Sequence, residues 1–383
     1  MRILLLVQVC AAHAISHFHI MVLPALVPLL PARYQASFVE IGFAITVFSM
    51  MSLIAHIPIG HLTDRIGPRP VLLAGLCLGS ASFASLAYVD SYAWLLAAMA
   101  AAGVANGVYH PGGYAMISRG VAKARTGRAF SMYTFAGFLG TAVTPAAVYG
   151  VLTLGGIELV FLAAAAVGVV GALLFLVPDR SLAPPAREQE AKDGSGRARL
   201  FTRPVRVLTL VFTLLSLVSV GTNNFSAAAL TRGYSIDLAL ANVALSALLF
   251  TSAFGVLAGG FLADRIARPG LMTAASLLAL TVVTTVMAAT IPSASLIVAM
   301  MAAMGFTFGL VAPSRDLLVR AAAPAGAEGR VFAIVSTGFN TGGAVGPLIF
   351  GWLLDNGEPW QIFGVVALFG LLATILTAVQ GKA

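Results

Sequence analysis

The sequence predicts an all-α integral membrane protein, with twelve transmembrane helices arranged in two pseudo-symmetric six-helix bundles. Of its 383 residues, 59% are hydrophobic and only 9% are charged, and the mean hydropathy is +0.96. Soluble domains carry about 25% charged residues, so most of this chain must lie in lipid. The two other observations are a series of long apolar segments and a repeat of motifs between the two halves.

The apolar segments define the predicted helices. A helix needs about 20 mostly apolar residues to cross a bilayer. Residues 1–178 and 205–383 each hold six such segments and are the two predicted bundles, and the polar residues 179–204 are the predicted cytoplasmic linker. The predicted spans are 4–31, 37–60, 71–89, 93–117, 128–152, 156–178, 205–230, 238–262, 271–291, 293–317, 329–353 and 360–380.

The repeat shows that the bundles are related. Gly-x-x-x-Asp-Arg-Ile begins at Gly60 and again at Gly260, each time between two apolar segments. Pro111 corresponds in the same way to Pro313. Two parallel six-span units are the internal symmetry of one class of secondary transporter.

Charge placement predicts the orientation. If the sides alternate at each span, nearly all Lys and Arg residues fall on the side of the Gly60 motif, and only Arg33 and Arg232 face the other side. By the positive-inside rule, both termini then lie in the cytoplasm, as in a multi-pass protein of a bacterial inner membrane. The formal net charge of +8 therefore needs no nucleic-acid partner.

The paired Gly-x-x-x-Asp-Arg motifs, the twelve spans and the polar linker resemble the major facilitator superfamily over essentially the whole chain. Ser16-His17-Phe18-His19 and the segment from Asn106 to Gly113 resemble its fosmidomycin-resistance-like bacterial subgroup. The resemblance implies secondary active transport of a small organic molecule by alternating access. It implies no enzymatic activity and no cofactor, and we expect the chain to function as a monomer.

In that superfamily, the loop with the repeated motif locks the cytoplasmic gate. The alternative is a positively charged loop that only sets topology. Pro68 and Ala267 depart from the family pattern, which implies a weaker lock. The residues with an expected gating role are Gly60, Asp64, Arg65, Gly67, Arg69, Gly260, Asp264 and Arg265.

Histidines are the candidate proton carriers. His13 and His17 are four residues apart and share one face of the first span. Ionisable side chains inside a membrane helix are functional candidates, and imidazole titrates near neutral pH. The first alternative is a neutral histidine hydrogen bonded to a neighbouring helix. The second is a metal site, which would need His110 as a third ligand; the prediction is no metal site.

The fourth span contains Asn106, Gly107, His110 and Pro111, which predict a locally broken helix. Broken helices at corresponding positions of both halves indicate a transport site. The matching stretch in the tenth span contains Arg315, which we expect either to face the cavity and attract an anion or to snorkel. Asp316 is expected to pair with Arg320. The uncharged polar candidates are Asn223 and Asn224 in the seventh span and Asn340 in the eleventh.

The energy source is predicted by exclusion. No P-loop motif occurs in the sequence, so a P-loop ATPase is excluded. Met99 stands where many proton-coupled exporters have an arginine, so a coupling proton would need His13, His17 or His110. Together with the resemblance to the exporters of that subgroup, this predicts a proton-coupled exporter. The alternatives are an uptake symporter or uniporter for a small organic anion, and a membrane sensor or metal-binding protein on a transporter scaffold.

Overall fold

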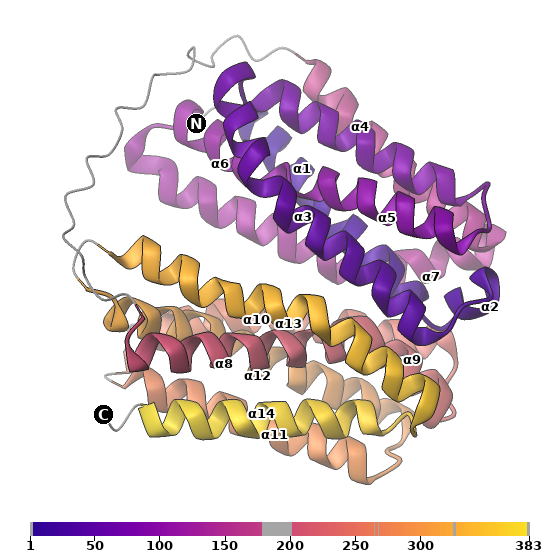
Figure 1. The fold of residues 1–383 in the computed structure, drawn as a ribbon, viewed down its shortest axis with the longest axis vertical. Helices are drawn as coiled ribbons and strands as arrows, with labels where there is room; N and C mark the ends of the chain where they lie inside the picture. Colours follow the sequence, from indigo (N-terminus) through magenta and orange to yellow (C-terminus); the bar gives the residue numbers. More distant parts are fainter. Residues whose placement is uncertain (1–2, 178–200, 264, 267, 325–326, 381–383) are drawn as a thin grey trace. The chain divides into compact units, whose positions relative to one another are not determined.

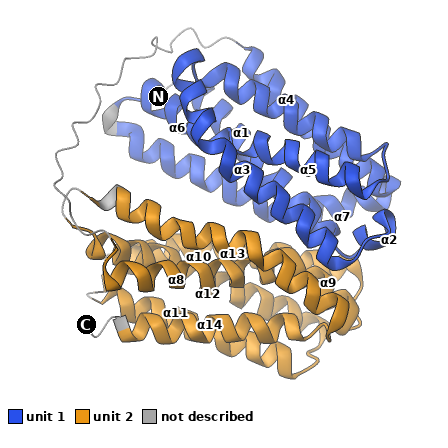
Figure 2. Ribbon diagram, in the orientation of Figure 1, with its two compact units in different colours: residues 1–189 blue, residues 190–383 orange. Residues whose placement is uncertain are grey.

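The computed structural model describes residues 3–177, 201–263, 265–266, 268–324 and 327–380. These residues form helices and their connections, with no strand among them. The chain divides into two compact units, Met1–Gln189 and Glu190–Ala383, which Figure 2 colours separately. Most of the predicted linker, together with Asp264 and Ala267, lies outside the described residues.

The first unit contains five long helices and two short ones (Figure 1). Helix α1 packs along α7, α3 along α5, and α4 against both α5 and α7. Their bounds are α1 Ile3–Leu26, α2 Leu30–Tyr34, α3 Phe38–Ile66, α4 Pro68–Leu86, α5 Tyr92–Asn106, α6 Tyr109–Gly120 and α7 Lys123–Leu176.

The second unit repeats this plan (Figure 1). Helix α10 packs along α12, α13 along α8, and α11 against α12 and α14. The bounds are α8 Arg203–Val220, the π-helix η1 Gly221–Phe225, α9 Ser226–Gly233, α10 Leu238–Ala263, α11 Pro269–Ala289, α12 Ala294–Ala322, α13 Glu328–Asn356 and α14 Gln361–Gln380.

The twelve predicted spans are all present. Ten helices of the described residues are long and apolar enough to cross a membrane. One of them, Arg125–Leu176, is two spans, because the backbone leaves helical geometry at Gly155 and turns through a positive φ of 74° at Gly156. The 29-residue α13, which packs along α8, is the remaining span. The prediction of two six-helix bundles is therefore confirmed.

The first copy of the repeated motif is more helical than the sequence suggested. Helix α3 continues through Gly60 and Asp64 to Ile66, and α4 begins at Pro68. Gly67 alone makes the turn, with the positive φ of 88° that favours glycine. Pro68 is well placed at the first position of α4, since that position needs no backbone N–H. The expected polar loop is thus a one-residue turn.

Glycines let the helices of each unit approach closely. A Cβ added to Gly140 of α7 would lie 2.1 Å from the carbonyl oxygen of Ala14 in α1. In the second unit, a Cβ at Gly338 of α13 would lie 2.1 Å from the carbonyl oxygen of Thr209 in α8. Small residues at such crossings let backbones touch inside a membrane, where van der Waals packing replaces the hydrophobic effect.

The predicted helix break is present in one half only. Helix α5 ends at Asn106 and α6 begins at Tyr109, as expected for the fourth span. The prediction of a corresponding break at Pro313 is wrong, because α12 continues through this proline without interruption. A single proline can bend a helix without ending it. The irregular segment of the second unit is instead η1, in the seventh span.

Candidate functional site

Three of the predicted residues meet inside the first unit. His13 and His17 lie on α1, and His110 lies in the first turn of α6. One ring nitrogen of each lies within 4.8 Å of the others. The ring of His13 is central, with centroids 4.6 Å from that of His17 and 5.2 Å from that of His110. We call these three residues the histidine cluster.

Helix α7 orients two of the rings. His13 Nδ1 donates to the carbonyl oxygen of Tyr133 at 2.7 Å, and its ring stacks on the Tyr133 ring at 3.8 Å. His17 Nδ1 bonds to the hydroxyl oxygen of Thr141 at 2.8 Å. Thr141 donates its own proton to the carbonyl of Gly137, so it accepts from His17. Both histidines therefore carry their proton on Nδ1 and leave a lone pair on Nε2.

The cluster depends on a glycine and a tyrosine. A Cβ on Gly137 would lie 2.6 Å from His13 Cε1 and 3.1 Å from His17 Cδ2, so a side chain there would displace both rings. The Tyr133 hydroxyl donates to the carbonyl of Tyr109 at 2.8 Å. This bond ties α7 to the break between α5 and α6, immediately before His110.

The cluster lies deep in the unit. His13 is ten residues from the first residue of α1, and His110 is ten residues from the last residue of α6. These two helix ends lie together, because Leu5 fills the space that a side chain on Gly120 would need. At 1.5 Å per residue, the histidines lie about 15 Å from this end. That depth is close to the middle of a hydrocarbon core about 30 Å thick.

A polar group on α3 extends the cluster. His56 Nδ1 donates to the carbonyl of Ser52 at 2.6 Å, and its ring lies 6.2 Å from that of His110. The predicted Asn106 donates to the Ser52 hydroxyl at 2.9 Å. Asn106 thus secures the end of α5 to α3 beside the histidines.

Sequence reasoning missed four of these neighbours: Ser52, His56, Tyr133 and Thr141. His56 could have been found, because it is an ionisable residue within a span, like the histidines that were chosen. Tyr133 and Thr141 carry no such signal. Their role depends on α7 lying beside α1, and that pairing is a tertiary contact.

The first copy of the repeated motif makes two contacts at one end of its unit. Asp64 pairs with Arg119 at the end of α6, at 3.0 Å. Arg69 Nε donates to the carbonyl of Phe175 at 3.0 Å, and its guanidinium also bonds to the carbonyl of Val177. Arg69 therefore caps the last carbonyls of α7. Arg65 is exposed, and nothing lies within 4 Å of a Cβ added at Gly60.

The second copy is less fully described. Gly260 lies within α10, and a Cβ there would meet open space. The Arg265 guanidinium, beyond the end of α10, lies 3.9 Å from the centroid of the Phe261 ring, a cation–π contact with that helix. Asp264 falls outside the described residues.

Arg315 has a different ion-pair partner from the one expected from the sequence. Its Nε and Nη2 lie 3.0 Å and 2.9 Å from Asp316 Oδ1, and its guanidinium lies 4.4 Å from the Phe212 ring centroid. The expected pairing of Asp316 with Arg320, which would have left Arg315 free, is therefore corrected. Because the carboxylate and the aromatic face already hold Arg315, its charge is largely offset.

The three predicted asparagines of the second unit lie in two different environments. Asn223 and Asn224 lie in η1, where Asn223 Nδ2 donates to the Ser219 hydroxyl at 3.0 Å. π-Helical turns inside α-helices occur often at functional sites. Asn340 is an exposed residue of α13.

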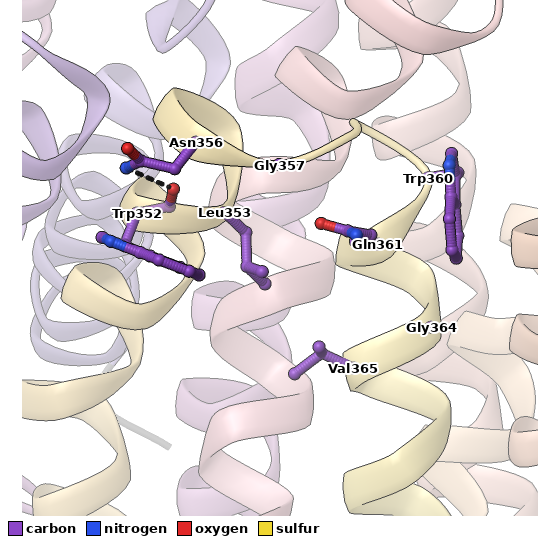
Figure 3. A pocket seen from close by; sticks show the side chains of 8 residues that line it. All are labelled: Trp352, Leu353, Asn356, Gly357, Trp360, Gln361, Gly364 and Val365. Carbon is purple, nitrogen blue, oxygen red and sulfur yellow. Dashed lines mark hydrogen bonds between the residues drawn. The ribbon is translucent and has the colours of Figure 1, made fainter.

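A crevice of about 380 Å³ lies elsewhere, between the end of α13 and the start of α14 (Figure 3). Two indoles flank it, Trp352 and Trp360, which are 56% and 47% exposed. Asn356 donates to the carbonyl of Trp352 at 3.1 Å. Exposed tryptophans at helix ends are typical of the membrane–water interface. We therefore assign the two indoles beside this crevice to anchoring the helix ends at that interface. Its lining is Trp352, Leu353, Asn356, Gly357, Trp360, Gln361, Gly364 and Val365.

Comparison with protein families gives one match, which covers nearly the whole chain. The model described as Major Facilitator Superfamily matches residues 9–235 and residues 209–380. The first range contains the first predicted bundle and the linker and extends into the second bundle, and the second range lies within the second bundle.

Two curated relatives match at low identity. The chain is 25% identical over 252 residues to the "Fosmidomycin resistance protein" of Escherichia coli (strain K12), covering 64% of this chain and 61% of the relative. It is 27% identical over 144 residues to the "Uncharacterized MFS-type transporter YfnC" of Bacillus subtilis (strain 168), covering 37% and 34%. Each match spans less than two thirds of the relative's length.

Solved structures share the fold over almost the full chain. A bacterial homologue of the human lysosomal transporter Spinster, inward-facing and unoccupied, matches with a TM-score of 0.78 at 14% identity, covering 99% of this chain and 95% of that chain. The nucleoside transporter NupG, in a mutant form, matches with a TM-score of 0.81 at 14% identity, covering 98% and 99%. At these identities the comparison shows the fold alone.

Proposed function

The chain belongs to the major facilitator superfamily, and we propose that it is a proton-coupled exporter of a small organic molecule. Family and fold make it a secondary transporter in a membrane and not an enzyme. The proton, the direction of transport and the class of substrate are the proposed parts.

The histidine cluster supports proton coupling. Three imidazoles lie within contact distance of one another at the depth where transporters of this kind bind substrate and coupling ion. The lone pairs on His13 Nε2 and His17 Nε2 are available to accept a proton. A second positive charge in so small a cluster is repelled by the first, so the cluster holds one proton at a time. That property suits an exchange of one proton for substrate.

The name of one relative supports export. A transporter that confers resistance does so most simply by removing the compound, and the first curated relative is named as a resistance protein. The alternative was uptake of an organic anion, which depended on a free Arg315. Since Asp316 already offsets that charge, this alternative loses its predicted attractor. The family match gives no support to a protein whose main role is sensing or metal binding in place of transport.

We assign the repeated motif to gating in an alternating-access cycle. The Asp64–Arg119 pair links α3 to α6, and the Arg69 cap links α4 to the end of α7, so these contacts tie together the ends of four spans of the first unit. Such contacts would keep this end of the unit rigid while it moves as one body. We place the protein in a bacterial inner membrane, with this end of the unit and both termini on the cytoplasmic side. We take the monomer as the functional form.

Flux into proteoliposomes with an imposed pH gradient tests the proposal. The panel should contain small drugs and small organic anions. We expect at least one compound to move faster when the gradient is applied, and the His17→Ala variant to lose that acceleration. The His61→Ala variant is the matched control, because His61 is an exposed histidine outside the cluster.

Two results would count against the proposal in different ways. Flux that ignores the gradient for every transported compound would remove proton coupling. Undiminished gradient-driven flux in His17→Ala would remove His17 from the proton pathway and leave the transporter assignment intact.

A further inference from the structure

We propose that the histidine cluster is also a binding site for one divalent transition-metal ion of the zinc type, with His13, His17 and His110 as its ligands. The proposal goes beyond proton-coupled transport and does not depend on it. Imidazole nitrogen is a preferred ligand of Zn²⁺, Co²⁺, Ni²⁺ and Cu²⁺. Three protein ligands from two helices are enough for an open site with one position left for water or an anion.

The hydrogen bonds of His13 and His17 leave the Nε2 atom of each ring available as a metal ligand. His13 Nδ1 donates to the Tyr133 carbonyl and His17 Nδ1 donates to Thr141, so each Nε2 is unprotonated. A histidine that binds metal characteristically donates its other N–H to a carbonyl or a similar acceptor, which fixes the ring and raises its basicity. Two of the three ligands already have this outer partner.

One of these lone pairs has no partner. His13 is 4% exposed, and its Nε2 is a buried atom without a hydrogen bond in the described structure. Buried polar atoms are nearly always paired, and an exception calls for an explanation such as a bound ion. His13 lies at the centre of the cluster, between the other two rings, so an ion bound there would satisfy it.

The three ligand nitrogens must move slightly closer together to bind one zinc ion. In a tetrahedral zinc site with bonds of about 2.0–2.1 Å, ligand nitrogens lie roughly 3.4 Å apart. The present spread of up to 4.8 Å therefore has to close by about 1.4 Å at its widest. His17 and His110 are only half-buried, so their rings can turn. Gly137 keeps the space beside His13 and His17 open.

Binding of metal to the purified protein tests the proposal. After removal of any affinity tag, we expect one Zn²⁺ per chain by calorimetry. We also expect one Co²⁺ with the visible absorption of a four-coordinate site. His13→Ala, His17→Ala and His110→Ala should each abolish the Co²⁺ spectrum, and His61→Ala should leave it unchanged.

A second variant keeps all three ligands and changes only their support. Thr141→Val removes the acceptor of the His17 N–H at nearly constant size, and should weaken Zn²⁺ binding about 10- to 100-fold. Thr141→Ser, which retains the hydroxyl, should bind as the parent does. This pair stays informative if a histidine variant fails to fold.

Two outcomes would overturn the metal site: no stoichiometric binding, or binding that persists in all three histidine variants. Neither bears on gradient-driven flux measured without metal. Conversely, loss of proton coupling in the flux assay leaves the metal measurement unaffected, so the two proposals fail separately.

Discussion

The histidine cluster and the Asp64 ion pair differ in their depth within the first unit. The histidines of the cluster lie about 15 Å from the helix ends, by the rise of 1.5 Å per residue. Asp64 lies at a helix end with a side chain that is 65% exposed. An exposed ion pair of this kind contributes about 0–1 kcal/mol to stability. If Asp64 matters, it therefore matters through the transport cycle and much less through the fold.

Asp64→Asn tests this separation. We expect the apparent free energy of unfolding in detergent to change by less than about 1 kcal/mol. The proposed gating role predicts a lower transport rate, because the Asp64–Arg119 contact between α3 and α6 is lost. Proteoliposome flux and thermal unfolding of the same preparation measure the two effects.

Asp90→Asn is the matched control. Asp90 is 59% exposed and pairs with Arg33 at 2.5 Å, on the side away from the repeated motif. Arg33 keeps its bond to Glu158 in this variant. A similar slowing of transport in Asp64→Asn and Asp90→Asn would argue against a special gating role for Asp64.

At the scale of helices, the packing of α1 against α7 forms the histidine site. Their close crossing at Gly140 brings Tyr133, Gly137 and Thr141 to the histidines of α1. The sequence predicted the span of α1 and the two spans of α7, 128–152 and 156–178, and it predicted the break in the fourth span. It could not predict which span lies against α1, because a lipid-facing and a buried apolar stripe look alike when both are made of Leu, Val and Ala.

Gly140→Ala should therefore destabilise the first unit. The new Cβ would lie 2.1 Å from the carbonyl of Ala14, so the two backbones must separate. Overpacking of this kind costs about 1–3 kcal/mol. The expected readout is a lower midpoint of thermal unfolding in detergent, together with weaker gradient-driven flux.

Gly150→Ala is the control on the same helix. Nothing lies within 4 Å of a Cβ at Gly150, and replacing a helical glycine by alanine at an unstrained site stabilises by about 0.4–1 kcal/mol. If both variants shift the unfolding midpoint in the same direction, close packing at Gly140 is not the cause.

At the scale of the whole molecule, the orientation of the chain across the membrane can be tested. Replacing Cys10 and Cys77 by alanine removes the native thiols, and single cysteines can then be placed at Ser91 and Gly127, both exposed and on opposite predicted sides. In intact cells, a membrane-impermeant maleimide should label Ser91→Cys and spare Gly127→Cys. In lysed membranes both should react, and the reverse pattern in cells would invert the assigned topology.

The sequence alone determined the membrane location, the twelve spans, the duplication and the candidate histidines, since these depend on local composition and on spacing along the chain. The tertiary structure decided which residues meet. It placed His110 beside His13 and paired Arg315 with Asp316. It also reduced the first copy of the repeated motif to a one-residue turn at Gly67, and it showed that the irregular helix of the second unit lies at the π-turn of Asn223 and not at Pro313. Such outcomes depend on the packing of helices distant in sequence, because contact distances and hydrogen-bond partners are properties of pairs of helices and are not encoded in either helix alone.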